Sequence, residues 1–416
     1  MSGDQSMPKI TMGMLFRNKV IRTILFSVFF LQIGIWVRNY SILLYVIEKT
    51  NENPIAVSLI SVAEFAPIFL FSFIGGTFAD RWKPKKTMIW CDLLSAVSIF
   101  AVLLTLLFGS WKIIFFATLV SSILSQFSQP SGMKLFKIHV PEAMVQIGMS
   151  MYQTLFAVFM ILGPILGTYI YQQFGINAAI GIMGIAFVLS AVILTLLPPD
   201  QEVEEQEEKS SIWHEMKEGF SYVLSKRTLT LLGACFALAG LALGLTQPLT
   251  VFLVTEQLGL PKEQLQWLMA AFGTGMILGG GLTIGIASKI KPQVLLSFGL
   301  GASALGFFIM GISTEFWLTL TAEFLSGLFM PCIHIGINTL ILQGTEQKFI
   351  GRVNGILNPL FMGAMVLTMS ITGWLKETFS LIVMFEGAAI LFAFGILTMV
   401  PLMKRSPIVQ NEVQNS

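Results

Sequence analysis

The sequence predicts an all-α membrane protein with twelve transmembrane helices in two pseudo-symmetric six-helix bundles and with both termini in the cytoplasm. Three observations predict this fold class. Of the 416 residues, 55% are hydrophobic and only 12% are charged, which is about half the charged share of a soluble domain. Twelve apolar windows each approach the roughly 20 residues that a spanning helix needs. The basic residues lie predominantly at one set of ends of these windows, as the positive-inside rule requires.

The apolar windows are bounded by short polar stretches or by glycine and proline. The first is too long for a cleavable signal peptide and is predicted to be a span. The first six predicted spans cover residues 24–47, 54–79, 87–109, 112–130, 145–170 and 176–197. The second six cover residues 229–254, 263–287, 293–312, 316–341, 353–375 and 379–402. Continuous apolar runs exclude a transmembrane β-barrel, whose strands alternate in polarity.

The distribution of lysine and arginine tests this count. With a cytoplasmic N-terminus and alternating spans, the inner segments hold 20 of the 25 basic residues, and Arg38 alone lies inside a span. The outer loops hold Lys49, Lys112, Lys262 and Lys376. A miscounted helix would reverse the partition for every residue after it, so the bias supports twelve spans. A multi-pass protein of a plasma membrane, such as the bacterial inner membrane, is expected.

The longest polar stretch divides the chain into two halves. The predicted domains are an N-terminal bundle (1–197), a cytoplasmic linker (198–228) and a C-terminal bundle (229–416). Within the linker, prolines and an acidic run precede a short amphipathic helix, which is expected to lie at the membrane interface; a regulatory partner site is the alternative. The sequences of residues 78–84 and 286–292 resemble each other weakly at an offset of 208 residues. Such internal repeats are typical of transporters.

Residue patterns of other protein classes are missing from the sequence. The three cysteines, Cys91, Cys235 and Cys332, lie in apolar runs without metal-ligand spacing, so neither a disulfide framework nor a metal site is expected. No HExxH, GxSxG or paired-carboxylate motif occurs, which argues against a membrane-embedded enzyme. No basic stripe with interleaved aromatic residues suggests nucleic acid as a partner.

The loop between the second and third spans carries Gly76, Asp80 and Arg81, followed by the basic pair Lys85 and Lys86. This pattern resembles the signature loop of the major facilitator superfamily. Asp92, Pro130, Pro141-Glu142 and Gly351-Arg352-Val353 resemble the macrolide-efflux branch of its drug:proton antiporters. Gly163, Pro164 and Gly167 resemble part of the antiporter motif, whereas the fourth span lacks the arginine common in such proteins. The resemblance implies a secondary active transporter that works by alternating access.

The resemblance also implies roles for these motifs. Asp80, Arg81 and the lysine pair would latch the two bundles on the cytoplasmic side, although the cations could instead only set the topology. Asp92 is expected to contact this basic loop rather than substrate. Gly163 and Pro164 would weaken the backbone ladder and allow close helix approach; a simple packing kink is the alternative.

Ionisable residues inside the membrane are costly and are functional candidates. Arg38 and Glu64 lie about 13 and 15 Å below the outer ends of adjacent predicted spans, so they are expected to pair or to share a water-filled cavity. The pair would be purely structural, or Glu64 would carry a proton. Glu323 and Glu386 would face an outer vestibule, unless they are simply solvated. His334 would relay protons or be a neutral core residue.

The favoured function is proton-coupled efflux of amphipathic, macrolide-like drugs by a monomer, which would give antibiotic resistance. The proton gradient is the driving force, and no cofactor is expected. Export of an endogenous siderophore or lysolipid is the alternative transport function. A non-transporting receptor or scaffold with the same fold is a further alternative.

Overall fold

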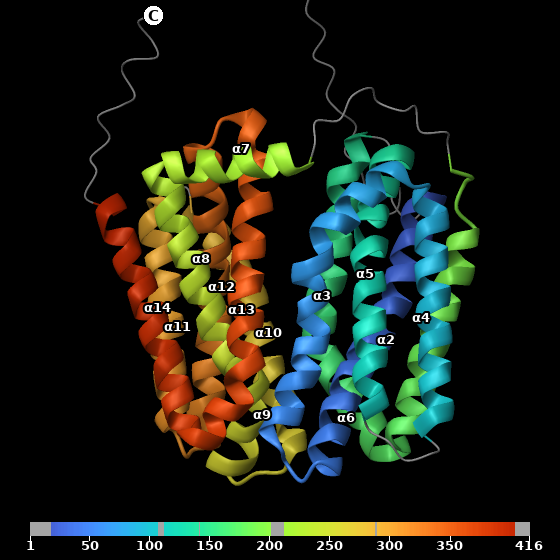
Figure 1. Cartoon of the computed structure of the whole chain (residues 1–416), viewed down its shortest axis with the longest axis horizontal. Helices are drawn as coiled ribbons and strands as arrows, with labels where there is room; N and C mark the ends of the chain where they lie inside the picture. Colours follow the sequence, from blue (N-terminus) through green and yellow to red (C-terminus); the bar gives the residue numbers. More distant parts are fainter. Residues whose placement is uncertain (1–17, 107–111, 141, 201–211, 288, 404–416) are drawn as a thin grey trace, which may run out of the picture. The chain divides into compact units, whose positions relative to one another are not determined.

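The computed structural model describes residues 18–106, 112–140, 142–200, 212–287 and 289–403, and within these ranges the chain is helical without any strand (Figure 1). The side chains of residues 72–81 lie outside the description. The predicted roles of Gly76, Asp80 and Arg81 therefore lie outside the described residues, although their backbone belongs to a helix.

The helices follow one another with short connections. The helices before the linker are α2 (Lys19–Lys49), α3 (Pro54–Arg81), α4 (Pro84–Leu106), α5 (Lys112–His139) and α6 (Glu142–Thr195). The linker contains α7 (Ile212–Ser225). Next come α8 (Arg227–Thr246), η1 (Gln247–Leu249), α9 (Thr250–Phe252), the π-helical turn η2 (Leu253–Gln257) and η3 (Lys262–Gln264). The last are α10 (Leu265–Ala287), α11 (Pro292–Ile312), α12 (Phe316–Gly344), η4 (Gln347–Phe349), α13 (Ile350–Thr378) and α14 (Leu381–Met403).

Eleven helical segments in the described ranges are long and apolar enough to cross a membrane. One of them belongs to α6, which has 54 residues and includes both the predicted spans 145–170 and 176–197. A straight helix of this length would measure about 81 Å, far more than the roughly 30 Å of a bilayer core. The backbone leaves the helical region at Gly175, where φ is 74° and ψ is −178°.

The two parts of α6 lie against the same stretch of α2. A Cβ atom built on Gly34 would lie 3.1 Å from the Cβ of Ala186, and one built on Gly163 would lie 2.4 Å from Cγ of Trp36. Residues 163 and 186 would be about 35 Å apart along a straight helix, yet they meet neighbouring positions on α2. The chain therefore folds back at Gly175, where the positive φ suits a residue without a Cβ atom.

The chain forms two compact units. The first contains Met1–Ile42 and Leu70–Glu204, and the second contains Leu43–Phe69 and Glu205–Ser416. Buried Ile21, Leu135 and Leu194 belong to the core of the first unit, and Leu300 and Leu357 belong to that of the second. The segment 43–69, which joins the end of α2 to the start of α3, thus packs with the helices that follow the linker. We call it the hairpin segment.

Glycine residues set the distance between α10 and α12 in the second unit. A Cβ atom on Gly275 would lie 2.2 Å from the carbonyl oxygen of Phe324, and one on Gly279 would lie 1.9 Å from that of Leu328. The two glycines are four residues apart and share a helix face, so they form the small-residue stripe that lets membrane helices approach closely. The backbones of α10 and α12 are therefore in direct contact.

Replacement of Gly279 with alanine is expected to lower the stability of the protein by about 1–3 kcal/mol, because the new methyl group must displace a backbone carbonyl. Thermal unfolding in detergent, followed by tryptophan fluorescence, measures this loss. The control is Gly280→Ala, because a Cβ atom at Gly280 would meet nothing within 4 Å. Equal midpoints for the two variants would contradict the close packing of α10 on α12.

Candidate functional site

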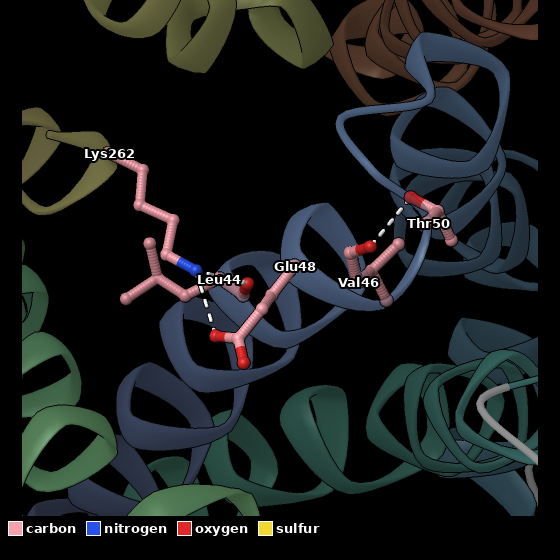
Figure 2. A network of polar contacts seen from close by, with 5 residues as sticks. All are labelled: Leu44, Val46, Glu48, Thr50 and Lys262. Atoms are coloured by element: carbon pink, nitrogen blue, oxygen red, sulfur yellow. Dashed lines mark hydrogen bonds and ion pairs between the residues drawn. The ribbon is translucent and has the colours of Figure 1, made fainter. Parts of the chain in front are cut away.

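An ion pair joins the hairpin segment to the start of η3 (Figure 2). Nζ of Lys262 lies 3.0 Å from Oε2 of Glu48 and donates a second hydrogen bond, of 3.3 Å, to the carbonyl oxygen of Leu44. One turn further, Thr50 donates its hydroxyl proton to the carbonyl oxygen of Val46. Lys262 therefore binds both a side chain and the backbone near the end of α2.

The turn between α2 and α3 places Glu48 beside Lys262. Asn51 and Glu52 have positive φ angles of 51° and 60°, a region that is costly for residues with a Cβ atom. The Asn53 side chain accepts the N–H of Ala56 at 3.0 Å and caps the start of α3. A tight reversal of the chain is thus fixed at this end of the hairpin segment.

A polar cleft of about 600 Å³ opens beside the ion pair, and its lining includes Glu48, Glu52, Lys262 and Glu263. The Lys262 side chain is 17% exposed and that of Glu48 is 57% exposed. An ion pair of this exposure contributes only about 0–1 kcal/mol. It can therefore hold the hairpin segment in register and still break readily.

Close backbone contacts hold the hairpin segment against α13. A Cβ atom on Gly373 would lie 2.6 Å from Cα of Ile55, and one on Gly363 would lie 2.8 Å from the ring of Phe69. The start of α3 and α13 thus run antiparallel over these residues. Lys376 forms an ion pair with Glu256 at the same end of α13, so this end is tied to both the hairpin segment and η2.

α13 is also fixed to α8 by small residues and hydroxyl groups. Thr372 donates to the carbonyl oxygen of Gly244 at 3.1 Å, and Thr368 donates to that of Leu241 at 3.0 Å. A Cβ atom on Gly244 would lie 2.2 Å from the carbonyl oxygen of Met365. α8 and α13 therefore form a closely packed pair, and the hairpin segment packs against α13 of this pair.

Among the described residues of the second unit, Glu323 carries the most deeply buried carboxyl group. It lies on α12 and is 8% exposed. Within the described part of the chain, no hydrogen bond or ion pair is formed by its carboxyl group. A carboxylate in such surroundings is costly unless it is neutralised. Glu323 is therefore suited to take up and release a proton when water reaches it.

The other predicted intramembrane residues are less buried or lie elsewhere. Glu386 on α14 is half-buried beside Gly311 of α11, and His334 on α12 is exposed. Arg38 is buried in the first unit, where its Nε donates to Asn39 at 2.8 Å. Glu64 is half-buried and belongs to the hairpin segment of the second unit. The pairing of Arg38 with Glu64 stays a prediction.

Asp92 belongs to a buried polar network in the first unit. It accepts the hydroxyl proton of Ser190 at 2.6 Å, and Ser190 lies 2.7 Å from the hydroxyl of Ser27. The three residues connect α4, α6 and α2. Asp92 thus has a serine as its hydrogen-bond partner among the described residues, and the network fixes the helices of this unit to one another.

The basic pair of the signature loop joins the start of α4 to the end of α6. Nζ of Lys85 donates to the carbonyl oxygens of Thr195 and Leu197 at 2.9 and 2.5 Å. In return, the carboxylate of Asp200 accepts the backbone N–H groups of Lys85 and Lys86 at 2.9 and 3.2 Å. A cation thus satisfies carbonyls at the end of one helix, and an anion satisfies amides at the start of the other.

Replacement of Asp200 with alanine is expected to open the start of α4. Loss of a capping carboxylate costs about 0.5–2 kcal/mol, so the amides of Lys85 and Lys86 should exchange about 2- to 30-fold faster. Hydrogen exchange followed by mass spectrometry measures this rate. The matched control is Glu377→Ala, which removes an exposed carboxylate from the end of α13. Unchanged protection at Lys85 in the Asp200 variant would exclude the capping role.

Gly163 and Gly167 lie where α6 contacts α2. A Cβ atom on Gly167 would lie 2.7 Å from Cβ of Tyr40, and that on Gly163 would overlap the Trp36 side chain. Between them, Pro164 is buried inside the helix. The Trp36 and Tyr40 rings stack at 6.0 Å. The close approach of α6 to α2 thus requires both glycines. This packing requirement holds independently of any role of the glycines in transport.

The linker helix α7 belongs to the second unit and packs against the start of α13. Glu218 accepts a hydrogen bond from Arg352 at 2.6 Å, and the Tyr222 ring stacks on Phe349 at 4.2 Å. Phe220 and Leu224 are 54% and 57% exposed. Arg352, which was singled out by the Gly351-Arg352-Val353 motif, thus anchors α7, whose exposed apolar residues suit a membrane interface.

Sequence reasoning missed Lys262, Glu48 and the glycines of α13. Lys262 was one of only four cations in the predicted outer loops, which was the available signal. No group of three metal-ligating side chains occurs among the residues that the structure describes.

Comparison with known proteins places this architecture in a family. The sequence profile of the Major Facilitator Superfamily matches residues 24–261 and 232–415. The MFS-type transporter YkuC of Bacillus subtilis (strain 168) is 25% identical over 377 residues, 88% of this chain and 87% of YkuC. Macrolide efflux protein A of Streptococcus pyogenes is 24% identical over 344 residues, 78% of this chain and 81% of that protein. A crystal structure of the nucleoside transporter NupG superposes with a TM-score of 0.72 at 14% identity. The superposition covers 91% of this chain and 100% of the NupG chain.

These findings define a multi-pass helical membrane transporter. The chain belongs to the major facilitator superfamily, and it is a transporter rather than an enzyme. The resemblance seen in the signature loop and the relation to macrolide efflux proteins are thereby confirmed.

Proposed function

We propose that the chain crosses the membrane twelve times with both termini in the cytoplasm. The fold-back of α6 at Gly175 supports two spans within this helix, which added to the other ten segments makes twelve. The charge bias of the loops supports the orientation. A six-helix bundle would then stand on each side of the linker, within a monomer in a bacterial cell membrane.

The transporter exports amphipathic, macrolide-like compounds by alternating access. The observation that carries this function is the attachment of the hairpin segment to η3 and α13, through Lys262 and Gly373. In the proposed topology these contacts lie at the outer face, where they would close the exit. A weak ion pair and a contact between glycine and backbone can separate without unfolding either helix. Relation to Macrolide efflux protein A supports the drug-like substrate.

Proton entry drives this export. One charge that moves across 100 mV releases about 2.3 kcal/mol. Two carboxyl groups within spans are suited to carry the proton, Glu64 in the hairpin segment and the buried Glu323 in α12. In the predicted pair, Arg38 would tune the protonation of Glu64, and His334 and Glu386 are secondary candidates for the relay.

A proteoliposome assay tests this function. An imposed proton gradient should drive accumulation of a macrolide. Without an imposed gradient, macrolide entry should withdraw protons from an interior that carries a pH-sensitive dye. Glu64→Gln is expected to reduce the proton flux at least tenfold, whereas Glu377→Gln, which changes an exposed side chain, should leave it intact. An unchanged proton flux in Glu64→Gln would exclude Glu64 from the mechanism. Macrolide transport that does not depend on the proton gradient would refute proton coupling.

A further inference from the structure

An apolar groove runs between α2 and the first part of α6 in the first unit. Its volume is about 290 Å³, and its lining comes from one face of each helix. α2 contributes Arg22, Leu25, Phe26 and Phe29, and α6 contributes Met151, Thr154, Leu155 and Val158. Both sets follow the i, i+3, i+4, i+7 spacing, so two parallel stripes enclose a trough about 10 Å long.

The surface of the groove is open and almost wholly apolar. Phe26, Phe29 and Val158 are 51%, 39% and 37% exposed. The Thr154 hydroxyl already donates to the carbonyl oxygen of Ser150, and Phe29 is held edge-on against Phe159 at 5.6 Å. The walls thus offer aromatic and aliphatic surface and no free side-chain hydroxyl to a ligand.

A single cation stands at one end of this trough. Arg22 is exposed, and its guanidinium forms no hydrogen bond or ion pair with any residue that the structure describes. Arg22 lies one turn into α2, at the end that the positive-inside rule places at the cytoplasmic face. A guanidinium is suited to hold a carboxylate or phosphate with two parallel hydrogen bonds.

We propose that this groove binds an anionic amphiphile with a single hydrocarbon chain, which is taken from the cytoplasmic leaflet as cargo. The chain would lie along Phe26 and Phe29, and the anionic head would pair with Arg22. This assignment rests on the proposed export function and adds a second substrate class beside the macrolide-like compounds. It favours a lysolipid-like cargo over a siderophore, because the groove carries one cation and no further polar walls.

Size and charge both select this ligand. Drug-sized ligands occupy pockets of about 300–1,000 Å³, and this groove lies at the lower limit of that range. One slender chain fits better than a macrocycle or a two-chain phospholipid. A cationic head group at the Arg22 end of the groove would be repelled by the like charge of the guanidinium.

Equilibrium binding to the full-length protein in zwitterionic nanodiscs tests the proposal. The probes are dodecanoate and dodecyltrimethylammonium, which share a chain and differ in the sign of the head, and empty nanodiscs correct for partition into lipid. Wild-type protein should bind dodecanoate at least tenfold more tightly. Arg22→Gln should remove this preference, and Phe26→Ala should weaken both probes. Lys19→Gln is the matched control, because Lys19 is an exposed cation of the same helix end that does not line the groove.

Equal binding of the two probes, or dodecanoate binding that survives Arg22→Gln, would overturn the proposal. Retention of added phosphatidylglycerol against excess dodecanoate would also overturn it, since the groove would then hold a resident lipid. Transport separates this inference from the proposed function. Gradient-driven macrolide export without dodecanoate binding refutes only the groove assignment. Arg22-dependent binding of dodecanoate that no gradient can move refutes only its role as cargo, and macrolide that no gradient can move refutes the export function.

Discussion

Replacement of Gly373 with alanine is expected to shift the transporter away from the state with the hairpin segment attached to α13. The new Cβ atom would lie 2.6 Å from Cα and 2.7 Å from N of Ile55, and 2.7 Å from the carbonyl oxygen of Pro54. All three are backbone atoms, so a change of side-chain rotamer cannot relieve the overlap. α13 cannot retreat easily either, because Thr368 and Thr372 tie it to α8.

The size of the shift follows from the cost of overpacking. A cost of about 1–3 kcal/mol displaces an equilibrium about 5- to 150-fold. Because alternating access requires both states, export by Gly373→Ala should slow by a similar factor. Thermal stability should change less than in Gly279→Ala, since the hairpin segment can move away as a unit, whereas α10 and α12 belong to one packed group of helices.

Spin labels report this movement directly. Labels at Asn51 and Glu263, both in the lining of the polar cleft, should give a short distance in the wild type and a longer one in Gly373→Ala. Lys262→Met removes the ion pair and should lengthen the distance only in a minor population, in keeping with a pair worth about 0–1 kcal/mol. Gly280→Ala is the control for the added methyl group. An unchanged distance distribution in Gly373→Ala would mean that this contact does not govern opening.

The sequence predicted the helices far better than it predicted their contacts. Apolar windows locate spans because lipid demands them locally, and the predicted break between residues 170 and 176 contains Gly175, where α6 turns back. Lys262 and Glu48 are separated by 214 positions, so no local pattern could pair them. Such a pairing depends on the tertiary fold, which brings η3 next to the hairpin segment.

The signature loop illustrates the same limit within one motif. The resemblance implied that Asp80, Arg81 and the lysine pair latch the two bundles, which stays a prediction. In the structure, Lys85 binds two carbonyl oxygens at the end of α6. The partner in the opposite direction, Asp200, lies at the head of the acidic linker, where composition alone indicated a solvated connection. A carboxylate in a charge run and a carboxylate that caps a helix look identical until the chain is folded.

Replacement of Glu323 with glutamine is expected to abolish proton-driven accumulation while leaving exchange of substrate across the membrane. Glutamine preserves the shape and hydrogen-bonding capacity of the buried side chain but cannot release a proton. Since Glu323 is 8% exposed and the described residues give it no ionic partner, the substitution removes no ion pair and should not destabilise α12. Loss of activity would therefore report on chemistry rather than on folding.

The expected magnitude is set by the driving force. One proton per cycle at 100 mV provides about 2.3 kcal/mol, which supports an accumulation of about 50-fold. Glu323→Gln should reduce this ratio to one, and Glu323→Asp should retain part of it because a carboxyl group remains. The exposed Glu377 at the end of α13 provides the control, and Glu377→Gln should keep the full accumulation. If Glu323→Gln accumulated substrate like the wild type, the proton would have to travel through another group, with Glu64 as the next candidate.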